Sequence, residues 1–346
     1  MGFDSARLGG AVTGRRRTRA RLARCALLLG ALGCAVAAGG ASAAQDEIVP
    51  AGAWSHELAL FYQEQDRAYN RFGNLTALRS FLLPGLDARR TTTGFITRTV
   101  TRLEFRFTYG LSDSWNLSLE IPYLSLDQDS KLVSTSTDPL VGEEVKSFRR
   151  QSLSGLGDGR LTLLHRPLFS DRNAVLWGFG YTQALADREA RPGQHALGLG
   201  SPSPSLRAFV HYTRFPRVER SRFDLRFQFE VGIDGEIDTF DEGSQPFRKG
   251  NAATFQLGWS QEFGRFAAGV QLSEMRRSQS RLDGAGQDDP EKETAARLRL
   301  GYGNLVELER QPLPFPYLLT IEFERSLRGF NVIFRDGTTL SLQYFF

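Results

Sequence analysis

The chain has 346 residues, with 43 basic and 39 acidic side chains and a formal net charge of +4. The surplus comes from the first 44 residues, which hold seven arginines and a single acid, Asp4. Without them the chain has 36 basic and 38 acidic residues, a balance that argues against a nucleic-acid-binding protein. Both cysteines, Cys25 and Cys34, also lie in this leader, which excludes a disulfide framework, a cysteine zinc site and thiol chemistry elsewhere.

Residues 1–44 have the features of a secretory signal peptide. Residues 1–24 are basic, residues 25–38 form an apolar stretch, and Ala41-Ser42-Ala43 matches the small-residue cleavage pattern. We therefore expect export by the general secretory route and a single mature domain over residues 45–346.

Strict alternation of apolar and polar residues dominates the mature domain. Over residues 222–233, six apolar side chains from Phe223 to Ile233 alternate with charged and polar ones. Successive side chains of a strand point to opposite faces, so this is the pattern of a half-buried β-strand. Residues 95–109 repeat it. The mean hydropathy is −0.31, and no run of about 18 apolar residues follows the leader, which excludes a helical membrane protein.

The same test predicts about twelve strands along the chain. They lie near residues 54–63, 95–109, 115–126, 155–166, 173–186, 204–213, 222–233, 252–263, 265–276, 294–302, 317–326 and 338–346.

The predicted connections alternate between short and long. Short ones fall at residues 110–114, 167–172, 214–221 and 264, with a longer proline-rich one at 303–316. Long polar ones fall at residues 64–94, 127–154, 187–203, 234–251, 277–293 and 327–337. Outer-membrane barrels have short periplasmic turns and long extracellular loops. The expected fold is thus an all-β, antiparallel transmembrane β-barrel of about 12 strands; a soluble secreted sandwich or barrel is the alternative.

Aromatic residues and the C-terminus fit the membrane interpretation. Aromatic side chains gather beside the short turns, as in an interfacial girdle: Tyr109, Trp115, Trp177, Tyr212, Tyr302 and Tyr317. The chain ends in Phe346 with Tyr344 two residues before it, which resembles the C-terminal recognition signal of outer-membrane barrels. We expect the barrel-assembly machinery and outer-membrane lipid as partners, in the outer membrane of a Gram-negative cell.

If the apolar faces meet lipid, the polar faces line a lumen. Alternation places these charged residues inside: Arg98, Arg102, Glu104, Arg106, Glu120, Arg160, Asp224, Arg226, Glu230, Arg297, Arg299, Glu322 and Glu324. An unpaired charge in a narrow lumen is costly, so opposite signs are expected to pair across it. The same residues suit a polar passage and a structural salt-bridge lining equally well.

The first long connection contains a segment with helical spacing. Leu75, Leu78 and Leu82 recur three and four residues apart, Asn74 suits the N-cap, and Pro84-Gly85 suits the stop. We expect a short amphipathic helix whose leucines form an apolar gate at the barrel mouth, with simple packing against strand ends as the alternative.

Signals for an enzyme are weak, and the sequence predicts that the chain is not an enzyme. No catalytic residues, metal or cofactor are expected. Of the four histidines only His211 is expected to point inward from a strand, near the periplasmic end. The glycine-rich run at residues 155–159 lacks the Lys-Ser/Thr of a phosphate loop and is expected to allow a bulge or a close approach of the backbone. The acidic residues of 282–293 are expected to be a solvated charge run.

Three segments resemble one family. Residues 109–117, followed by Ile121-Pro122-Tyr123, are similar to its first hairpin; residues 154–161 are similar to its glycine-rich strand start; and residues 198–206 are similar to another recurring element. The family is that of outer-membrane proteins of the phenol-degradation meta-pathway type, described as transporters. The resemblance covers roughly residues 95–346 and implies a barrel that passes small aromatic or other hydrophobic solutes.

Three functions follow as hypotheses. The first is an outer-membrane channel that passes small molecules, aromatic or hydrophobic ones included, through a mixed-charge lumen. The second is a closed structural or adhesive barrel whose loops bind partners. The third is a membrane-embedded lipid hydrolase, which requires a Ser or Asp beside a His at the outer-leaflet level.

Overall fold

A computed structural model of the chain describes residues 49–84, 90–136, 143–170, 172–183, 185, 203–216, 221–239, 243–286, 289–303 and 317–345. The signal peptide and cleavage site predicted at residues 1–44 lie outside them, as does Phe346. Within the described residues, no helix is long and apolar enough to cross a membrane.

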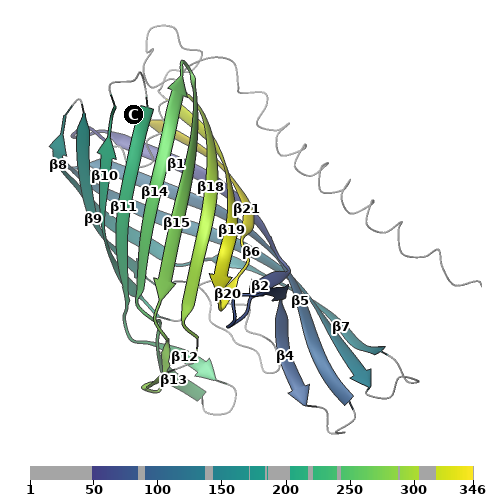
Figure 1. Ribbon diagram of the computed structural model, residues 1–346. Coiled ribbons are helices and arrows are strands. Elements are labelled where there is room, and N and C mark those ends of the chain that lie inside the picture. Colours follow the sequence, from purple (N-terminus) through teal and green to yellow (C-terminus); the bar gives the residue numbers. More distant parts are fainter. Residues whose placement is uncertain are drawn as a thin grey trace, which may run out of the picture.

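The molecule is a closed antiparallel barrel of twelve strands (Figure 1). Its strands are β1 (Trp54–Gln65), β5 (Arg90–Gly110), β6 (Trp115–Ser136), β8 (Gly159–Phe169), β9 (Asn173–Gln183), β10 (Ser205–Arg214), β11 (Ser221–Gly232), β14 (Ala252–Phe263), β15 (Phe266–Arg277), β18 (Glu291–Gly303), β19 (Tyr317–Phe330) and β21 (Asp336–Phe345). Each corresponds to one predicted strand, which confirms the predicted fold.

The first and last strands of the barrel lie side by side. β1 pairs with β21, with Ser55 opposite Phe345, and with β5 on its other side, with Trp54 opposite Tyr109. β5 pairs in turn with β6, which completes the ring. The barrel has two ends. We call one of them the turn end; it holds the start of β1, the end of β21 and the connections at 111–114 and 264–265. We call the opposite end the loop end.

The outer face of the barrel is apolar and exposed. On β11, Phe223, Leu225, Phe227 and Phe229 are all exposed, Phe227 at 53%, whereas Asp224 on the other face lines the interior. A soluble protein rarely exposes so large an apolar surface. An outward apolar band with a polar interior is the arrangement of barrels that span membranes.

Four strands extend beyond the barrel at the loop end (Figure 1). β5 and β6 are 21 and 22 residues long, and their outer halves are flanked by β4 (Arg79–Pro84) and β7 (Glu143–Leu156). Residues 127–154, expected to be a polar connection, therefore lie mostly in strands. The other short strands of the loop end are β2 (Arg67–Tyr69), β3 (Leu75–Ala77), β12 (Gly235–Thr239), β13 (Gly243–Arg248), β16 (Arg281–Leu282), β17 (Ala285–Gly286) and β20 (Val332–Ile333).

The glycine-rich run at 155–159 marks the point where the extension leaves the barrel. β6 pairs with β8 up to Glu120 opposite Arg160, and then with β7 from Tyr123 opposite Leu156. Between them the Gly157 amide donates to the Pro122 carbonyl at 2.8 Å. The run is therefore an interruption between two strands and not a bulge within one strand.

Two further expectations about the connections are wrong. Of the segment expected to be a helix, residues 75–77 and 79–84 are strands, and Leu75 pairs with Tyr69 because the neighbouring strand edges offer backbone partners. The connection expected at 327–337 shrinks to residues 331–335, because β19 continues to Phe330. The alternation of long and short connections is therefore not strict.

Candidate functional site: the charged barrel interior

The barrel interior contains a cavity of about 430 Å³. Eleven of the thirteen charged residues expected inside line it: Arg102, Glu104, Arg106, Glu120, Arg160, Asp224, Arg226, Arg297, Arg299, Glu322 and Glu324. The other two lie towards the loop end. Arg98 donates from Nη2 to Gln128 Oε1 at 2.9 Å, and Glu230 pairs with Lys249 Nζ at 3.5 Å.

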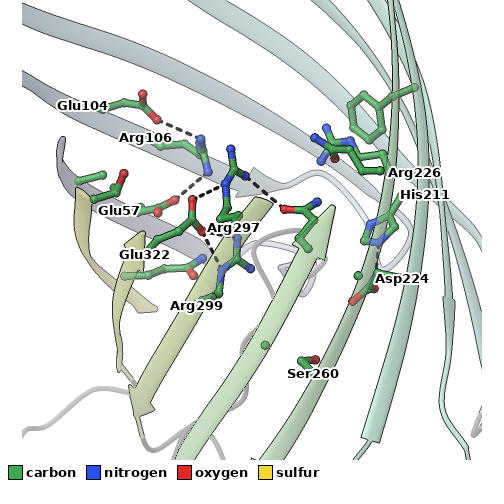
Figure 2. A pocket seen from close by; sticks show the side chains of 18 of the residues that line it. Glu57, Glu104, Arg106, His211, Asp224, Arg226, Ser260, Arg297, Arg299 and Glu322 are labelled. Atoms are coloured by element: carbon green, nitrogen blue, oxygen red, sulfur yellow. Dashed lines mark hydrogen bonds and ion pairs between the residues drawn. The ribbon is translucent and has the colours of Figure 1, made fainter. Parts of the chain in front are cut away.

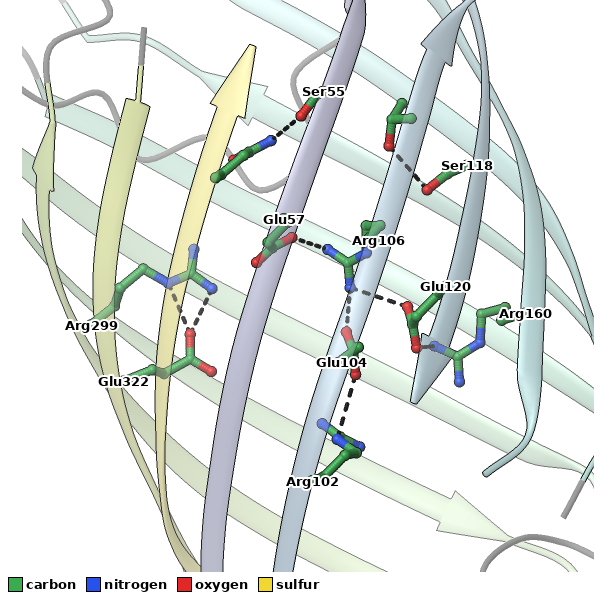
Figure 3. Close-up of polar contacts among 12 residues, drawn as sticks. Ser55, Glu57, Arg102, Glu104, Arg106, Ser118, Glu120, Arg160, Arg299 and Glu322 are labelled. Atoms are coloured by element: carbon green, nitrogen blue, oxygen red, sulfur yellow. Dashed lines mark hydrogen bonds and ion pairs between the residues drawn. The ribbon is translucent and has the colours of Figure 1, made fainter. Parts of the chain in front are cut away.

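Arg106 is the centre of the first charge cluster. Its guanidinium reaches Glu57 Oε2 at 2.7 Å, Glu104 Oε1 at 3.0 Å and Glu120 Oε2 at 3.1 Å (Figure 3). Arg102 and Arg160 complete the cluster by pairing with Glu104 at 3.4 Å and Glu120 at 3.0 Å, respectively. Three arginines and three glutamates therefore balance on the wall formed by β1, β5, β6 and β8.

The second cluster lies between β18 and β19. Arg297 bridges two carboxylates, with Nε 3.0 Å from Glu322 Oε1 and Nη2 2.7 Å from Glu324 Oε2. Arg299 donates from Nε to Glu322 Oε2 at 2.9 Å (Figure 2). Since these residues are cross-strand partners in the register of β18 and β19, the sheet itself sets the pairing.

His211 belongs to a third, smaller group near the turn end. Its Nε2 lies 2.9 Å from Asp224 Oδ1, which also accepts from Arg222 Nε at 2.7 Å and from Thr213 Oγ1 at 2.9 Å. His211 is buried and points into the cavity, as predicted (Figure 2). The carboxylate required by the hydrolase hypothesis is therefore beside His211, but at the end of the barrel opposite the loops.

The inward face of β9 has no side chains at two successive positions. Gly178 lies opposite Phe209 of β10, and Gly180 lies opposite Arg207. A Cβ at Gly178 would come within 2.6 Å of the Phe209 ring, so the glycine provides the space for that ring. Phe209 packs there against Leu164 and Leu176 as a small apolar cluster in the wall.

Two arginines flank this phenylalanine. The guanidinium carbon of Arg226 lies 4.1 Å from the centre of the Phe209 ring, and that of Arg207 lies 5.6 Å from it. Arg207 also donates from Nη2 to Thr162 Oγ1 at 3.4 Å. Both arginines line the cavity, so this wall combines an aromatic ring with two cations.

Several cavity residues were missed from the sequence: Glu57, Arg207, Phe209, Gln256 and Gln271. Strict alternation would have found Glu57, which lies between outward His56 and Leu58. The inward face of β10 was harder to recognise, because Phe209 puts an apolar residue between Arg207 and His211.

The gate leucines lie apart from the cavity lining. Leu75 is 41% exposed, Leu78 is half-buried, and the side chain of Leu82 lies outside the described set. Their role as a gate stays a prediction. Of the C-terminal signal, Tyr344 contacts His56 edge-on with ring centres 5.3 Å apart. In the described part of the chain, no group of three or more His, Cys, Asp or Glu side chains is arranged to hold a metal.

No protein-family model matches the chain, and no curated protein sequence matches it. Among solved structures, it is similar to an outer membrane channel from Pseudomonas putida F1, with 18% identity and a TM-score of 0.57 over 88% of this chain and 98% of that one. At this level of sequence identity, the structural similarity shows a shared fold only.

Two further barrels are more distant. The beta domain of the Bordetella autotransporter BrkA has 7% identity and a TM-score of 0.41, over 85% of this chain and 99% of that one. A Pseudomonas aeruginosa FadL homologue has 10% identity and a TM-score of 0.38, over 85% and 90%. Both likenesses are too low to bear on the function of this chain.

Proposed function

We propose that this protein is an outer-membrane channel that passes small molecules, aromatic or hydrophobic ones included, through its charged interior. The observation that carries the proposal is the combination of an apolar outer face with a cavity of about 430 Å³ lined by charged and polar side chains. Small-molecule sites typically enclose about 300–1,000 Å³. The fold shared with the P. putida outer membrane channel supports the same function.

The proposed location is the outer membrane of a Gram-negative cell, reached by the general secretory route. The turn end would then face the periplasm and the loop end the exterior. Aromatic side chains at the turn end support this orientation: Trp115 stacks on His165 with ring centres 4.2 Å apart, and Trp177 contacts both rings. Such residues prefer the membrane interface.

A closed structural or adhesive barrel is the main competing function, because ion pairs such as those of Arg106 also stabilise a sealed interior. Single-channel recording separates the two. The mature chain is refolded, its β-structure is checked by circular dichroism, and it is inserted into a planar bilayer. Discrete conductance steps, reduced when phenol or another small aromatic compound is added, are expected of the channel. A folded barrel that inserts but conducts no current would contradict the proposal.

A further inference from the structure

A group of charged side chains lies outside the cavity, on the outer face of the barrel near the loop end. The strands that carry it, β15, β18 and β19, lie side by side in the barrel wall (Figure 1). Its members are Glu274 and Arg276 of β15, Lys292 of β18 and Arg328 of β19. Gln271 of β15 lines the cavity, and side chains alternate along a strand, so Glu274 and Arg276 point outward. We call these four residues the outer charge group.

The register of the three strands brings the group together. Arg276 lies directly opposite Lys292, and Thr294 of β18 lies between Glu274 on one side and Arg328 on the other. Glu274 Oε1 accepts from Arg276 Nη2 at 2.7 Å and lies 3.3 Å from Lys292 Nζ. One carboxylate therefore serves a group that holds three cations, which leaves a local net charge of +2.

This arrangement favours a further anion. Like charges directly opposite each other on neighbouring strands destabilise a sheet, so the juxtaposition of Arg276 and Lys292 is costly without added negative charge. Both side chains are accessible, with 69% of Arg276 and 45% of Lys292 exposed, and Arg328 is exposed as well. An anion can therefore reach all three cations from outside the barrel.

The outer charge group borders the apolar outer face. Leu272 precedes Glu274 by two residues on the same face of β15, and Leu298 and Phe323 lie on the outer faces of β18 and β19; all three are exposed. The register shift between β18 and β19 leaves Leu327 as an extra residue next to Arg328, also exposed. The cations thus lie where the apolar band ends, which is the level of lipid headgroups in a barrel that spans a membrane.

The neighbouring surfaces do not continue the positive charge. On β14 the residue opposite Arg276 is Ala253, and on β11 the residue opposite Ala253 is Phe229. On the other side, Arg325 of β19 lies opposite Asp336 of β21, so those two charges balance. The positive charge is therefore local to the outer charge group rather than spread around the barrel.

We propose that Arg276, Lys292 and Arg328 bind the phosphate groups of lipid in the leaflet at the loop end. Arginine donates paired hydrogen bonds to phosphate oxygens, and lysine adds a third positive charge. The exposed leucines beside these cations contact the acyl chains of the same lipid. The inference adds a headgroup chemistry and a place on the barrel to the expected partnership with outer-membrane lipid. With the loop end facing the exterior, as proposed above, the ligand is the phosphorylated lipid of the outer leaflet.

The test measures lipid binding by calorimetry on the full mature chain, refolded in neutral detergent micelles. The probes are lipid A with both phosphates, the same lipid after removal of both phosphates, and inorganic phosphate. Lipid A is expected to bind at least about tenfold more tightly than its dephosphorylated form, because several cations near one anionic surface act together. Equal binding of the two lipids would overturn the proposal. Inorganic phosphate that binds as tightly as lipid A would overturn the assignment to a lipid.

Variants locate the site. Arg276→Gln, Lys292→Gln and Arg328→Gln are each expected to weaken binding of lipid A about fivefold and to leave the dephosphorylated lipid unchanged. Arg150→Gln removes the same charge from an exposed residue of β7, away from the outer charge group, and is the matched control with unchanged binding. Unaltered binding of lipid A in all three variants of the group would contradict the assignment.

A fourth variant separates binding from folding. Glu274→Gln removes the one carboxylate of the outer charge group and raises its net charge, so lipid A is expected to bind about fivefold more tightly. A variant that merely disturbed the fold would not tighten binding. Unchanged or weaker binding of lipid A by a folded Glu274→Gln barrel would overturn the proposal.

This inference and the channel fail in distinguishable ways, because lipid binding on the outer face does not depend on conduction. A barrel that conducts current but does not distinguish lipid A from its dephosphorylated form would overturn the lipid site and leave the channel. A barrel that binds lipid A through Arg276, Lys292 and Arg328 but stays silent in bilayers would overturn the channel and leave the lipid site.

Discussion

Gly180 of β9 lies opposite Arg207 of β10, and a Cβ at Gly180 would sit 3.4 Å from Arg207 Nε and 3.1 Å from Thr162 Oγ1. The absence of a side chain on β9 thus allows the arginine to lie across the strand towards Thr162. Gly180→Leu is expected to displace the guanidinium into the lumen and to lower the single-channel conductance, although every charge is retained. Recording in a planar bilayer measures the change.

The control for this glycine is Phe179→Leu, which changes an outward side chain on the same strand. Phe179 is exposed on the outer face, so its variant is expected to conduct as the parent protein does. If Gly180→Leu folds and conducts as the parent protein does, the position of Arg207 over β9 does not affect passage through the lumen.

Arg106 is expected to be the most sensitive position of the interior to substitution. Arg106→Gln would leave Glu57, Glu104 and Glu120 close together with less positive charge between them. Removing one partner of a buried ion pair typically costs about 3–5 kcal/mol. A loss at the lower end of that range is expected in the free energy of unfolding, measured by urea titration of the folded barrel.

A second substitution and a surface control complete this prediction. Glu104→Gln combined with Arg106→Gln removes one of the repelling carboxylates, so the double variant is expected to be more stable than Arg106→Gln alone. Arg150 and Asp129 form an exposed pair at 4.0 Å. Arg150→Gln is therefore expected to change stability by less than about 1 kcal/mol. Equal losses for Arg106→Gln and Arg150→Gln would show that the interior network contributes little.

The sequence predicted the barrel well because its strands alternate, and alternation depends only on the geometry of a single strand. β11 is the clearest case: each residue from Phe223 to Phe229 was placed on the correct face. The extension formed by β4 to β7 was not predicted, because its residues alternate weakly and its pairing depends on how far β5 and β6 continue past the barrel.

The site was harder to predict than the fold. Alternation identifies inward charges, but not which of them pair, because pairing depends on the register between strands distant in sequence. Arg106 contacts Glu57 only because β5 lies beside β1 in the barrel. The prediction of a helix at residues 74–85 was wrong for another reason. Leucine spacing describes this segment alone, whereas β3 and β4 are strands because they pair with the neighbouring segments β2 and β5.

The gate hypothesis predicts that polar substitution of its leucines changes conduction. If Leu75, Leu78 and Leu82 form an apolar barrier at the loop end, serine at all three is expected to raise the fraction of time that the channel conducts. The measurement is single-channel recording. Leu168→Ser, an exposed position near the turn end, is the control and is expected to leave conduction unchanged. Identical records for the triple variant and the parent protein would exclude a gate at these residues.

The C-terminal strand is expected to matter for assembly more than for stability. Tyr344 lies at the seam of the barrel, opposite His56 of β1 and Tyr317 of β19. If Tyr344 and Phe346 form the signal that the assembly machinery recognises, Tyr344→Ala and deletion of Phe346 should each lower the amount of folded barrel in outer-membrane fractions severalfold. The same variants refolded in detergent should unfold at nearly the same urea concentration as the parent protein, because most of the hydrogen-bond ladder between β1 and β21 is retained.

The control for this prediction is Tyr302→Ala, at the turn end of β18. It removes a comparable aromatic ring outside the signal and is expected to assemble normally. If it assembles as poorly as Tyr344→Ala, the aromatic girdle rather than the C-terminal signal sets the efficiency of assembly.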